Sequence, residues 1–181
     1  MTTASWSARI RHDSDATFRE WGSDFSARLA AVGLVQTADT SQINWVTVTR
    51  PAANTEAGFE VWQFNDTQQG TAPIVFRVGY GTGSSATVPR IQITVGTGSN
   101  GSGTITGTAL STTRSVHSNA AQATDTARQS YMCAVDGFFG FNWKVGSGVT
   151  EAGFFICRTC DSAGAPTATG AMVHWSIGTV G

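Results

Sequence analysis

The chain has 181 residues and a formal net charge of −1, and charged residues make up only 13% of it, about half the usual share. Its 11 Lys and Arg residues form no basic run, which argues against a nucleic-acid binder or a peripheral membrane protein. The N-terminus lacks the apolar region of a signal peptide, and no apolar run is long enough for a membrane span. We therefore expect a protein made in a cytosol, without a nucleic-acid or membrane partner.

The first 40 residues predict a strand followed by a helix. Residues 5–12 alternate, with Trp6, Ala8 and Ile10 on one face, as in a strand with one buried face. Apolar side chains then recur three and four residues apart at Phe18, Trp21, Phe25 and Leu29.

This spacing predicts an amphipathic helix over about residues 15–32. Asp13 or Ser14 is suited to cap its first turn, and Gly33 suits the left-handed position after its last turn. We expect Phe18, Trp21, Phe25 and Leu29 to pack the helix against the rest of the fold or against a neighbouring subunit.

After the helix, a period of two residues predicts strands along most of the chain. The candidate strands are residues 43–49, 58–64, 74–80, 90–95, 103–110, 130–135, 138–145, 153–159 and 171–177. Segments rich in Gly, Pro, Asn, Asp and Thr separate them, as in antiparallel sheets. We predict a mainly β protein: an antiparallel β-sandwich, jelly-roll-like, formed as one domain by residues 1–181. Residues 117–129 are polar and fit either a loop or a short helix.

The stretch ITVGTGSNGSGTITG, residues 93–107, contains the GxGxxG spacing of a dinucleotide-binding loop. Such a loop must be followed by a helix whose N-terminus holds the pyrophosphate. Here β-branched and Gly residues follow the glycines, and the first acidic residue after the loop is Asp125. We interpret the stretch as a connection between two antiparallel strands, and we expect no cofactor.

No catalytic constellation stands out. The chain has no GxSxG nucleophile motif, its three His residues (His12, His117 and His174) are scattered, and no two of its carboxylates are singled out as a glycosidase pair. We therefore do not expect an enzyme.

Three cysteines pose a separate question. Cys157, Cys160 and His174 have most of the spacing of a zinc site, and Cys133 could complete it. In a hairpin of residues 153–159 and 171–177, Cys157 and His174 would lie nearly opposite each other. A strand would nevertheless direct Cys157 and Cys160 to opposite faces. We expect buried, reduced thiols and no metal.

Four tryptophans, Trp45, Trp62, Trp143 and Trp175, fall in predicted strands. Core packing is the usual role of such residues. A platform on which sugar rings stack is the alternative, and it would suit the weakly charged surface rich in Thr, Ser and Asn.

Several segments resemble small structural proteins of tailed bacteriophages. They are FREWGSDFSARLAAVGLVQTADTSQINWVTV, RPAANTEAGFEVWQFNDTQQGTAPIVFRVGYGTG, PRIQITVGTGSNGSG and FFICRTCDSAGAPTATGAMV. The resemblance spans nearly the whole chain and implies a particle component, without assigning a chemistry to any residue.

We therefore expect a virion structural protein, assembled in the bacterial cytoplasm and working as an oligomer in the tail or baseplate region. Its partners would be other virion proteins and copies of itself. A capsid decoration protein and a carbohydrate-binding module for host surface glycans are the alternatives.

Overall fold

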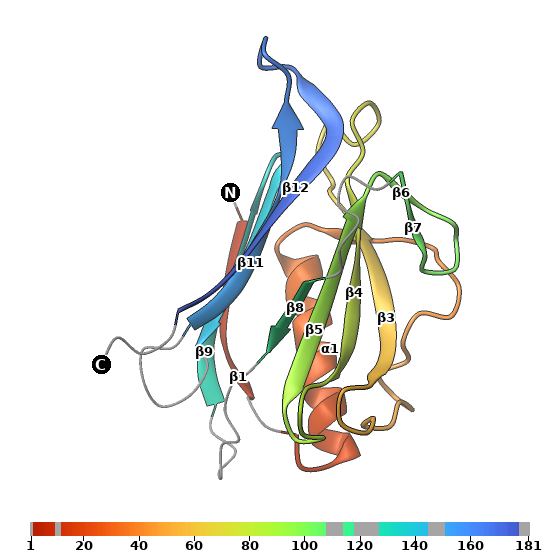
Figure 1. Ribbon diagram of the computed structural model, residues 1–181, viewed down its shortest axis with the longest axis vertical. Helices are drawn as coiled ribbons and strands as arrows, with labels where there is room; N and C mark the ends of the chain where they lie inside the picture. The colour runs from red at the N-terminus through yellow and green to blue at the C-terminus, as the bar shows by residue number, and fades with distance from the viewer. Residues whose placement is uncertain (1, 10–11, 108–113, 118–126, 145–150, 178–181) are drawn as a thin grey trace.

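The computed structural model describes residues 2–9, 12–107, 114–117, 127–144 and 151–177. Within these ranges the chain forms one α-helix, two five-stranded antiparallel sheets and a two-stranded hairpin (Figure 1). The two large sheets face each other as in a sandwich, and their inward side chains share one hydrophobic core with the helix. The predicted mainly β fold with antiparallel sheets and one helix is therefore confirmed.

Each large sheet consists mainly of strands that are neighbours in the sequence. Sheet A contains, in spatial order, β1 (Thr2–Arg9), β9 (Ala127–Val135), β10 (Phe138–Lys144), β11 (Glu151–Cys160) and β12 (Pro166–Ile177). Sheet B contains β2 (Val35–Gln36), β3 (Glu56–Gln63), β4 (Val75–Thr82), β5 (Pro89–Gly96) and β8 (Arg114–His117). β6 (Gly98–Ser99) and β7 (Ile105–Thr106) form the separate hairpin.

Most predicted strands are confirmed within a few residues. The segments predicted at 58–64, 74–80, 90–95, 130–135, 138–145, 153–159 and 171–177 correspond to β3, β4, β5, β9, β10, β11 and β12. The strand predicted at 5–12 begins earlier, as β1, and the side chains of Trp6, Ala8 and Ile10 lie outside the described part.

The prediction of a strand at 43–49 is wrong. Its side chains alternate only as far as Trp45, and the backbone then turns. Asn44 causes the turn, because its side-chain Oδ1 accepts from Val46 N at 2.9 Å and its carbonyl accepts from Val48 N at 2.9 Å. Such local hydrogen bonds by Asn compete with strand pairing, and Val46 is left 80% exposed.

The glycine-rich stretch forms the β6–β7 hairpin, as expected for a connection between antiparallel strands. Gly101 and Gly103 at its tip adopt φ values of +82° and +88°, which Gly reaches without strain. Of the strand predicted at 103–110, Ile105–Thr106 is confirmed as β7 and residues 108–110 lie outside the described residues. In the polar segment 117–129, His117 ends β8 and residues from Ala127 belong to β9, while residues 118–126 are not described.

The helix α1 spans Asp15–Ala31, close to the predicted 15–32. Ser14 caps it: the Ser14 side chain accepts from Thr17 N, and the Thr17 hydroxyl accepts in return from Ser14 N at 3.0 Å. This is a capping box in which Thr replaces the usual Glu or Gln. Gly33 has φ +96°, the left-handed conformation that ends many helices.

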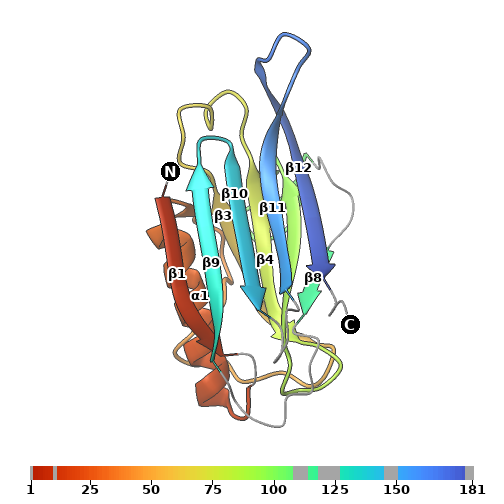
Figure 2. The ribbon, with the colours of Figure 1, turned by 90° about the vertical axis from the view of Figure 1, so that its left-hand side faces the viewer.

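The apolar stripe of α1 is enclosed in the core of its own chain. Phe18 and Leu29 are fully buried, and Trp21 and Phe25 are nearly so. The Phe25 ring makes edge contacts with Tyr80 of sheet B and with Phe141 of sheet A, at centroid distances of 5.9 and 4.9 Å. The helix therefore lies between the two sheets on the side where β1 and β3 run (Figures 1 and 2).

On the opposite side the two sheets approach each other directly. A Cβ built on Gly170 of β12 would lie 3.0 Å from Val95 Cγ1 of β5 and 3.1 Å from Ile74 Cδ1. Nothing larger than glycine fits there without movement of these side chains. The sandwich is thus wedge-shaped, wide at the helix and narrow at β12.

Part of the outer face of sheet B is covered by the β6–β7 hairpin. Ile105 of β7 packs on Val61 and Val75. A Cβ on Gly103 would overlap the ring of Phe59, so the hairpin lies close against β3. Beside the hairpin, the Arg77 guanidinium lies 4.6 Å from the centre of the Phe59 ring and pairs with Glu56.

Gly22 of α1 provides a sharp test of this packing. A Cβ there would overlap the ring of Trp45, so Gly22→Ala must displace that ring. Although Ala favours a helix over Gly by about 1 kcal/mol, we expect a net loss of about 1–3 kcal/mol of unfolding free energy in urea titrations. Ser23→Ala, at the exposed neighbouring position, should change stability by less than about 0.5 kcal/mol. A Gly22→Ala protein more stable than the wild type would contradict the packing.

Candidate functional site

A buried carboxylate lies beneath the helix. Glu60 of β3 is 2% exposed, and four neutral donors surround it. Its Oε1 accepts from Ser26 Oγ at 2.8 Å and from Trp45 Nε1 at 3.0 Å. Its Oε2 accepts from Trp62 Nε1 at 3.1 Å and from Tyr80 Oη at 2.6 Å. Because an ionised carboxylate only accepts hydrogen bonds, four donors satisfy both oxygens.

These contacts join four separate parts of the chain at one point: α1, the turn at Trp45, β3 and β4. Burial, followed by the neighbouring Glu60 carboxylate, raises the pKa of Tyr80 well above its usual value, so Tyr80 remains a proton donor. No groove leads to this carboxylate among the cavities lined by described residues. We assign the Glu60 network to structure rather than catalysis.

The tryptophans that could have formed a sugar platform lie inside the fold. Trp62 and Trp143 are 2% and 8% exposed, and Trp45 is partly buried against the core with its indole directed to Glu60. The side chain of Trp175 lies outside the described part. Core packing is therefore the role of these three tryptophans.

A buried charge pair joins the two sheets at another place. Arg158 of β11 contacts Asp66, in the β3–β4 connection, through two hydrogen bonds of 2.7 and 3.0 Å, and both side chains are 4% exposed. Arg158 Nε also donates to Ala72 O at 2.7 Å. Asp66 accepts in addition from the backbone N–H groups of Gly137, at the β9–β10 turn, and of Gln68.

The protonation of Asp66 follows from these contacts. Burial by itself would raise its pKa, but the hydrogen bonds from Arg158, Gly137 and Gln68 and the Arg158 charge together lower the pKa below the usual 3.8. Asp66 is therefore ionised over the whole neutral range, as a buried partner of Arg158 must be.

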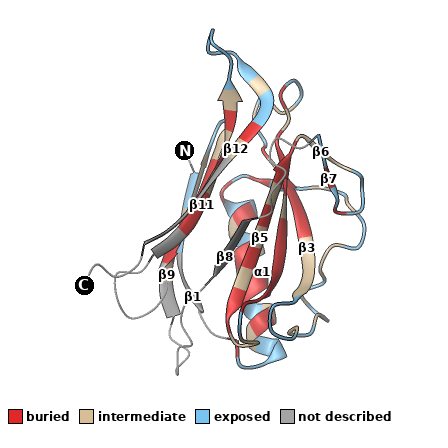
Figure 3. Ribbon diagram, in the orientation of Figure 1, coloured by how far each residue is buried: buried red, intermediate tan, exposed pale blue. Residues whose placement is uncertain are grey.

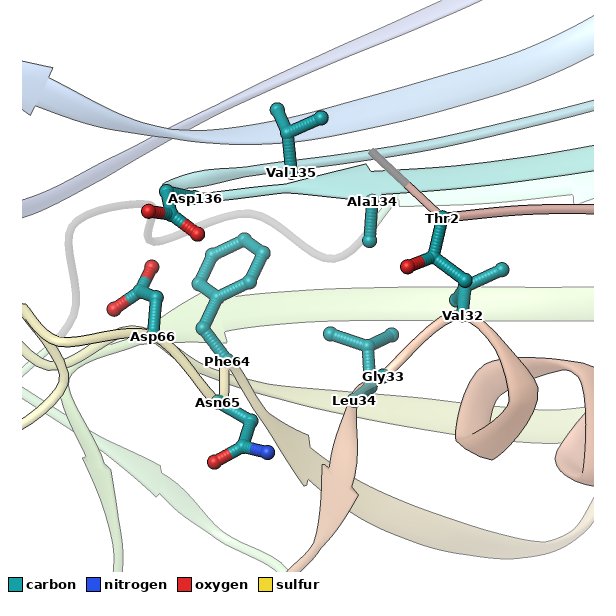
Figure 4. Close-up of a pocket in the computed structure, with 10 residues that line it drawn as sticks. All are labelled: Thr2, Val32, Gly33, Leu34, Phe64, Asn65, Asp66, Ala134, Val135 and Asp136. Atoms are coloured by element: carbon teal, nitrogen blue, oxygen red, sulfur yellow. The ribbon is translucent and has the colours of Figure 1, made fainter.

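A small cavity lies next to this pair, at the end of the sandwich near the C-terminus of α1 (Figure 4). Its volume is about 210 Å³. Asp66 and Asp136 direct their carboxylates into the same region, with the Phe64 ring beside them. Asp66 is already bound by Arg158, and no group of three His, Cys, Asp or Glu residues in the described part is placed to hold a metal. The cavity has no further chemical feature.

An open groove of about 620 Å³ lies beside the β6–β7 hairpin, and its mixed lining includes the polar residues Thr37, Asp39, Gln63, Gln69 and Ser99. Asp39 fixes the hairpin, because its carboxylate accepts from Thr37, Ser99 and Gly103 N. Burial by itself would raise the pKa of Asp39, but these hydrogen bonds lower it below its usual value. None of the described residues along this groove is aromatic, so a sugar ring would find no stacking partner there.

The cysteines are free and do not assemble as the zinc spacing suggested. In the β11–β12 pairing His174 lies opposite Phe154, whereas Cys157 lies opposite Ala171, so the expected juxtaposition of Cys157 and His174 is wrong. The thiols are also less buried than expected: Cys133 and Cys157 are partly exposed, and Cys160 is exposed.

The outer face of sheet A is the candidate interaction site. We use this name for the side chains of β1 and β9–β12 that point away from the core. No described element covers this face (Figure 2). The side chains described on it are those of Thr3, Ser5, Gln129, Tyr131, Cys133, Val135, Phe138, Gly140, Asn142, Gly153, Phe155, Cys157 and Ala171, none of them charged. The strand register assigns Arg9, Lys144 and Glu151 to positions on the same face, at one end of the strands.

A groove of about 490 Å³ runs across this face. Phe138 and Phe155 form one wall, with stacked rings whose centroids are 5.6 Å apart. The Phe138 ring also lies over Gly140, where a Cβ would be 3.1 Å from Phe138 Cε1. Tyr131 stands at the groove with 52% of its surface exposed, and Thr3, Ser5 and Asn142 add polar groups.

The strands of this face are apolar on both sides. Phe139, Phe141, Phe154 and Ile156 enter the core, while residues between them contribute apolar side chains to the outer face. Strands that read as continuous apolar runs are typical of sheets covered on both faces. An uncovered apolar face of this kind marks an interaction surface.

No family model matches the chain, and neither a curated protein nor a solved structure shows significant similarity to it. In the described part, no helix has the length and apolar character needed to span a membrane.

Replacing Glu60 by Gln tests the buried network. The amide nitrogen of Gln cannot accept, so in Glu60→Gln one of the two indole N–H groups, that of Trp45 or of Trp62, faces another donor. We expect a loss of about 2–3 kcal/mol of unfolding free energy. Glu56→Gln is the matched control on the same strand, because Glu56 pairs with Arg77 near the surface and its loss should cost about 1 kcal/mol or less. Equal effects of the two substitutions in denaturant titrations would contradict the assigned role of Glu60.

The Asp66–Arg158 pair predicts a specific pH dependence. A lowered folded-state pKa means that the ionised Asp66 stabilises the fold above its unfolded pKa of about 3.9, and that this contribution disappears as pH falls through the lower folded value. Asp66→Asn should therefore cost about 3–5 kcal/mol at pH 7, and its deficit relative to wild type should shrink below about pH 4.

The control is Asp24→Asn, which removes the exposed Asp24–Arg28 pair and should have a small effect at all pH values. A deficit of Asp66→Asn that stays constant from neutral to acidic pH would show that the charge of Asp66 does not stabilise the fold.

Proposed function

We propose that this chain is a structural component of a bacteriophage virion, an oligomeric subunit of the tail or baseplate region. The observation that carries the proposal is the uncovered outer face of sheet A, with its aromatic groove that no charged residue lines. A monomeric protein rarely leaves a contiguous apolar sheet face in water. Aromatic enrichment and depletion of charge are the compositional signs of an interface core.

Three further features favour an assembly subunit. The buried carboxylate Glu60 and the buried Asp66–Arg158 pair are fully engaged in holding the fold together, and the buried His12 ring packs against Phe18 and Trp21. The strand β12 ends sheet A as a long edge, and such edges invite pairing with other chains. The sequence segments that resemble tailed-phage structural proteins agree with this role. The strand order within each sheet is largely that of a meander. The proposal rests on the outer face of sheet A and does not require the jelly-roll form expected from the sequence.

A carbohydrate-binding module is the second candidate, and the groove on the outer face of sheet A favours it. An exposed Tyr131 ring beside Asn142, Thr3 and Ser5 combines a stacking surface with hydroxyl and amide groups, the chemistry that recognises a sugar. Capsid decoration is the alternative position for a structural subunit.

Copy number in the particle tests the structural proposal. Quantitative mass spectrometry of purified virions from a phage that encodes this chain should find it at three, six or more copies, because symmetric assemblies repeat their subunits. Absence of the chain from purified virions would contradict a structural role. A glycan array addresses the second candidate: saturable binding to one glycan, lost on Tyr131→Ala, would favour the carbohydrate-binding module.

A further inference from the structure

We propose that a second copy of this chain docks on the outer face of sheet A, with the Tyr131 ring of each copy seated in the groove of the other. The inference rests on the proposed function, since it names the partner of the face that carries that proposal.

The first argument is the shape of the face. The groove has aromatic walls at Phe138 and Phe155 and polar groups at Ser5 and Asn142. It therefore fits an aromatic ring with one polar tip, because such a ring can bury its body and keep a hydrogen bond. Tyr131, half exposed at the same groove, is such a ring. Each copy thus offers both an exposed ring and a groove that fits the ring of the other copy. A two-fold contact requires such a self-complementary surface.

The second argument is charge. None of the described residues that line the groove is charged, and Arg9, Lys144 and Glu151 hold positions only at one end of the strands. An acidic peptide or a phosphate group placed in the groove would lose its hydration without meeting an opposite charge there, which is unfavourable. A second copy presents the same neutral surface and avoids this loss.

The third argument is area. Five strands spaced about 4.8 Å apart, with outward side chains along about 20 Å of strand, give about 500 Å² per copy and about 1,000 Å² for a pair. Specific interfaces begin at about this size. We therefore expect a dimer that dissociates on dilution in the micromolar range, rather than an obligate one.

Sedimentation velocity of the full-length protein, from about 1 µM to about 1 mM, tests the contact. The wild type should pass from monomer to dimer, and Tyr131→Ala should raise the dissociation constant at least about tenfold. Val46→Ser, at an apolar side chain that is 80% exposed on a distant turn, should leave it unchanged. A wild type that stays monomeric throughout, or a Tyr131→Ala protein that dimerises equally well, would overturn the proposal.

The native cysteines provide a second readout that does not depend on a substitution. Cys133 lies along the groove and Cys160 is exposed outside it. Alkylation of Cys133 should slow several-fold as the protein concentration rises, while that of Cys160 should keep its rate. Equal behaviour of the two thiols would overturn the contact.

Photo-cross-linking separates this inference from the proposed function. With a benzophenone amino acid at position 131 in assembled virions, a link to a second copy supports the inference. A link to a different virion protein, with none to a second copy, overturns the second-copy partner but leaves the virion role intact. Conversely, a Tyr131-dependent dimer of a chain that is absent from virions supports the contact and contradicts the proposed function.

Discussion

The packing of Phe25 between Tyr80 of sheet B and Phe141 of sheet A keeps the two sheets apart along one side. The helix that carries Phe25 is held in this position by Ser26, which donates to the buried Glu60 carboxylate, and by Gly22, which leaves room for the Trp45 ring. At the opposite side Gly170 lets the sheets meet directly. Helix α1 therefore sets the wedge shape of the sandwich, and the core residues of both sheets follow its position (Figure 3).

The wedge also determines which surfaces remain for other molecules. The two inner faces are covered by each other and by α1, and the β6–β7 hairpin covers the part of the outer face of sheet B around Val61 and Val75 through Ile105. The outer face of sheet A carries aromatic and other apolar side chains around its groove but has no cover in the described part of the chain (Figure 2). Burying one large apolar side chain stabilises a protein or a complex by about 1.5–3 kcal/mol relative to leaving it in water. The free energy available from covering this face favours assembly.

Local pattern predicted the helix and most strands, because amphipathic spacing and the Ser14 cap act between neighbouring residues. The strand expected at 43–49 failed, since the hydrogen bonds of Asn44 outweighed the apolar alternation. A signal for the Glu60 network was present, because Glu60 shares an alternation face with Trp62, but its donors Ser26 and Tyr80 come from distant segments. Asp66 and Arg158 lie 92 residues apart, and no local pattern joins them. Apolar runs such as FFGF already indicated the uncovered face, because they give a strand apolar residues on both of its faces.

Hydroxyl-radical footprinting of the protein, dilute in solution and in its assembled state, shows which surface the assembly covers. We expect Tyr131, Phe138 and Phe155 to lose reactivity on assembly, while Val46, exposed on a distant turn, keeps it. Unchanged labelling of these three rings, with protection elsewhere on the surface, would contradict the claim that the outer face of sheet A is the surface through which this protein assembles.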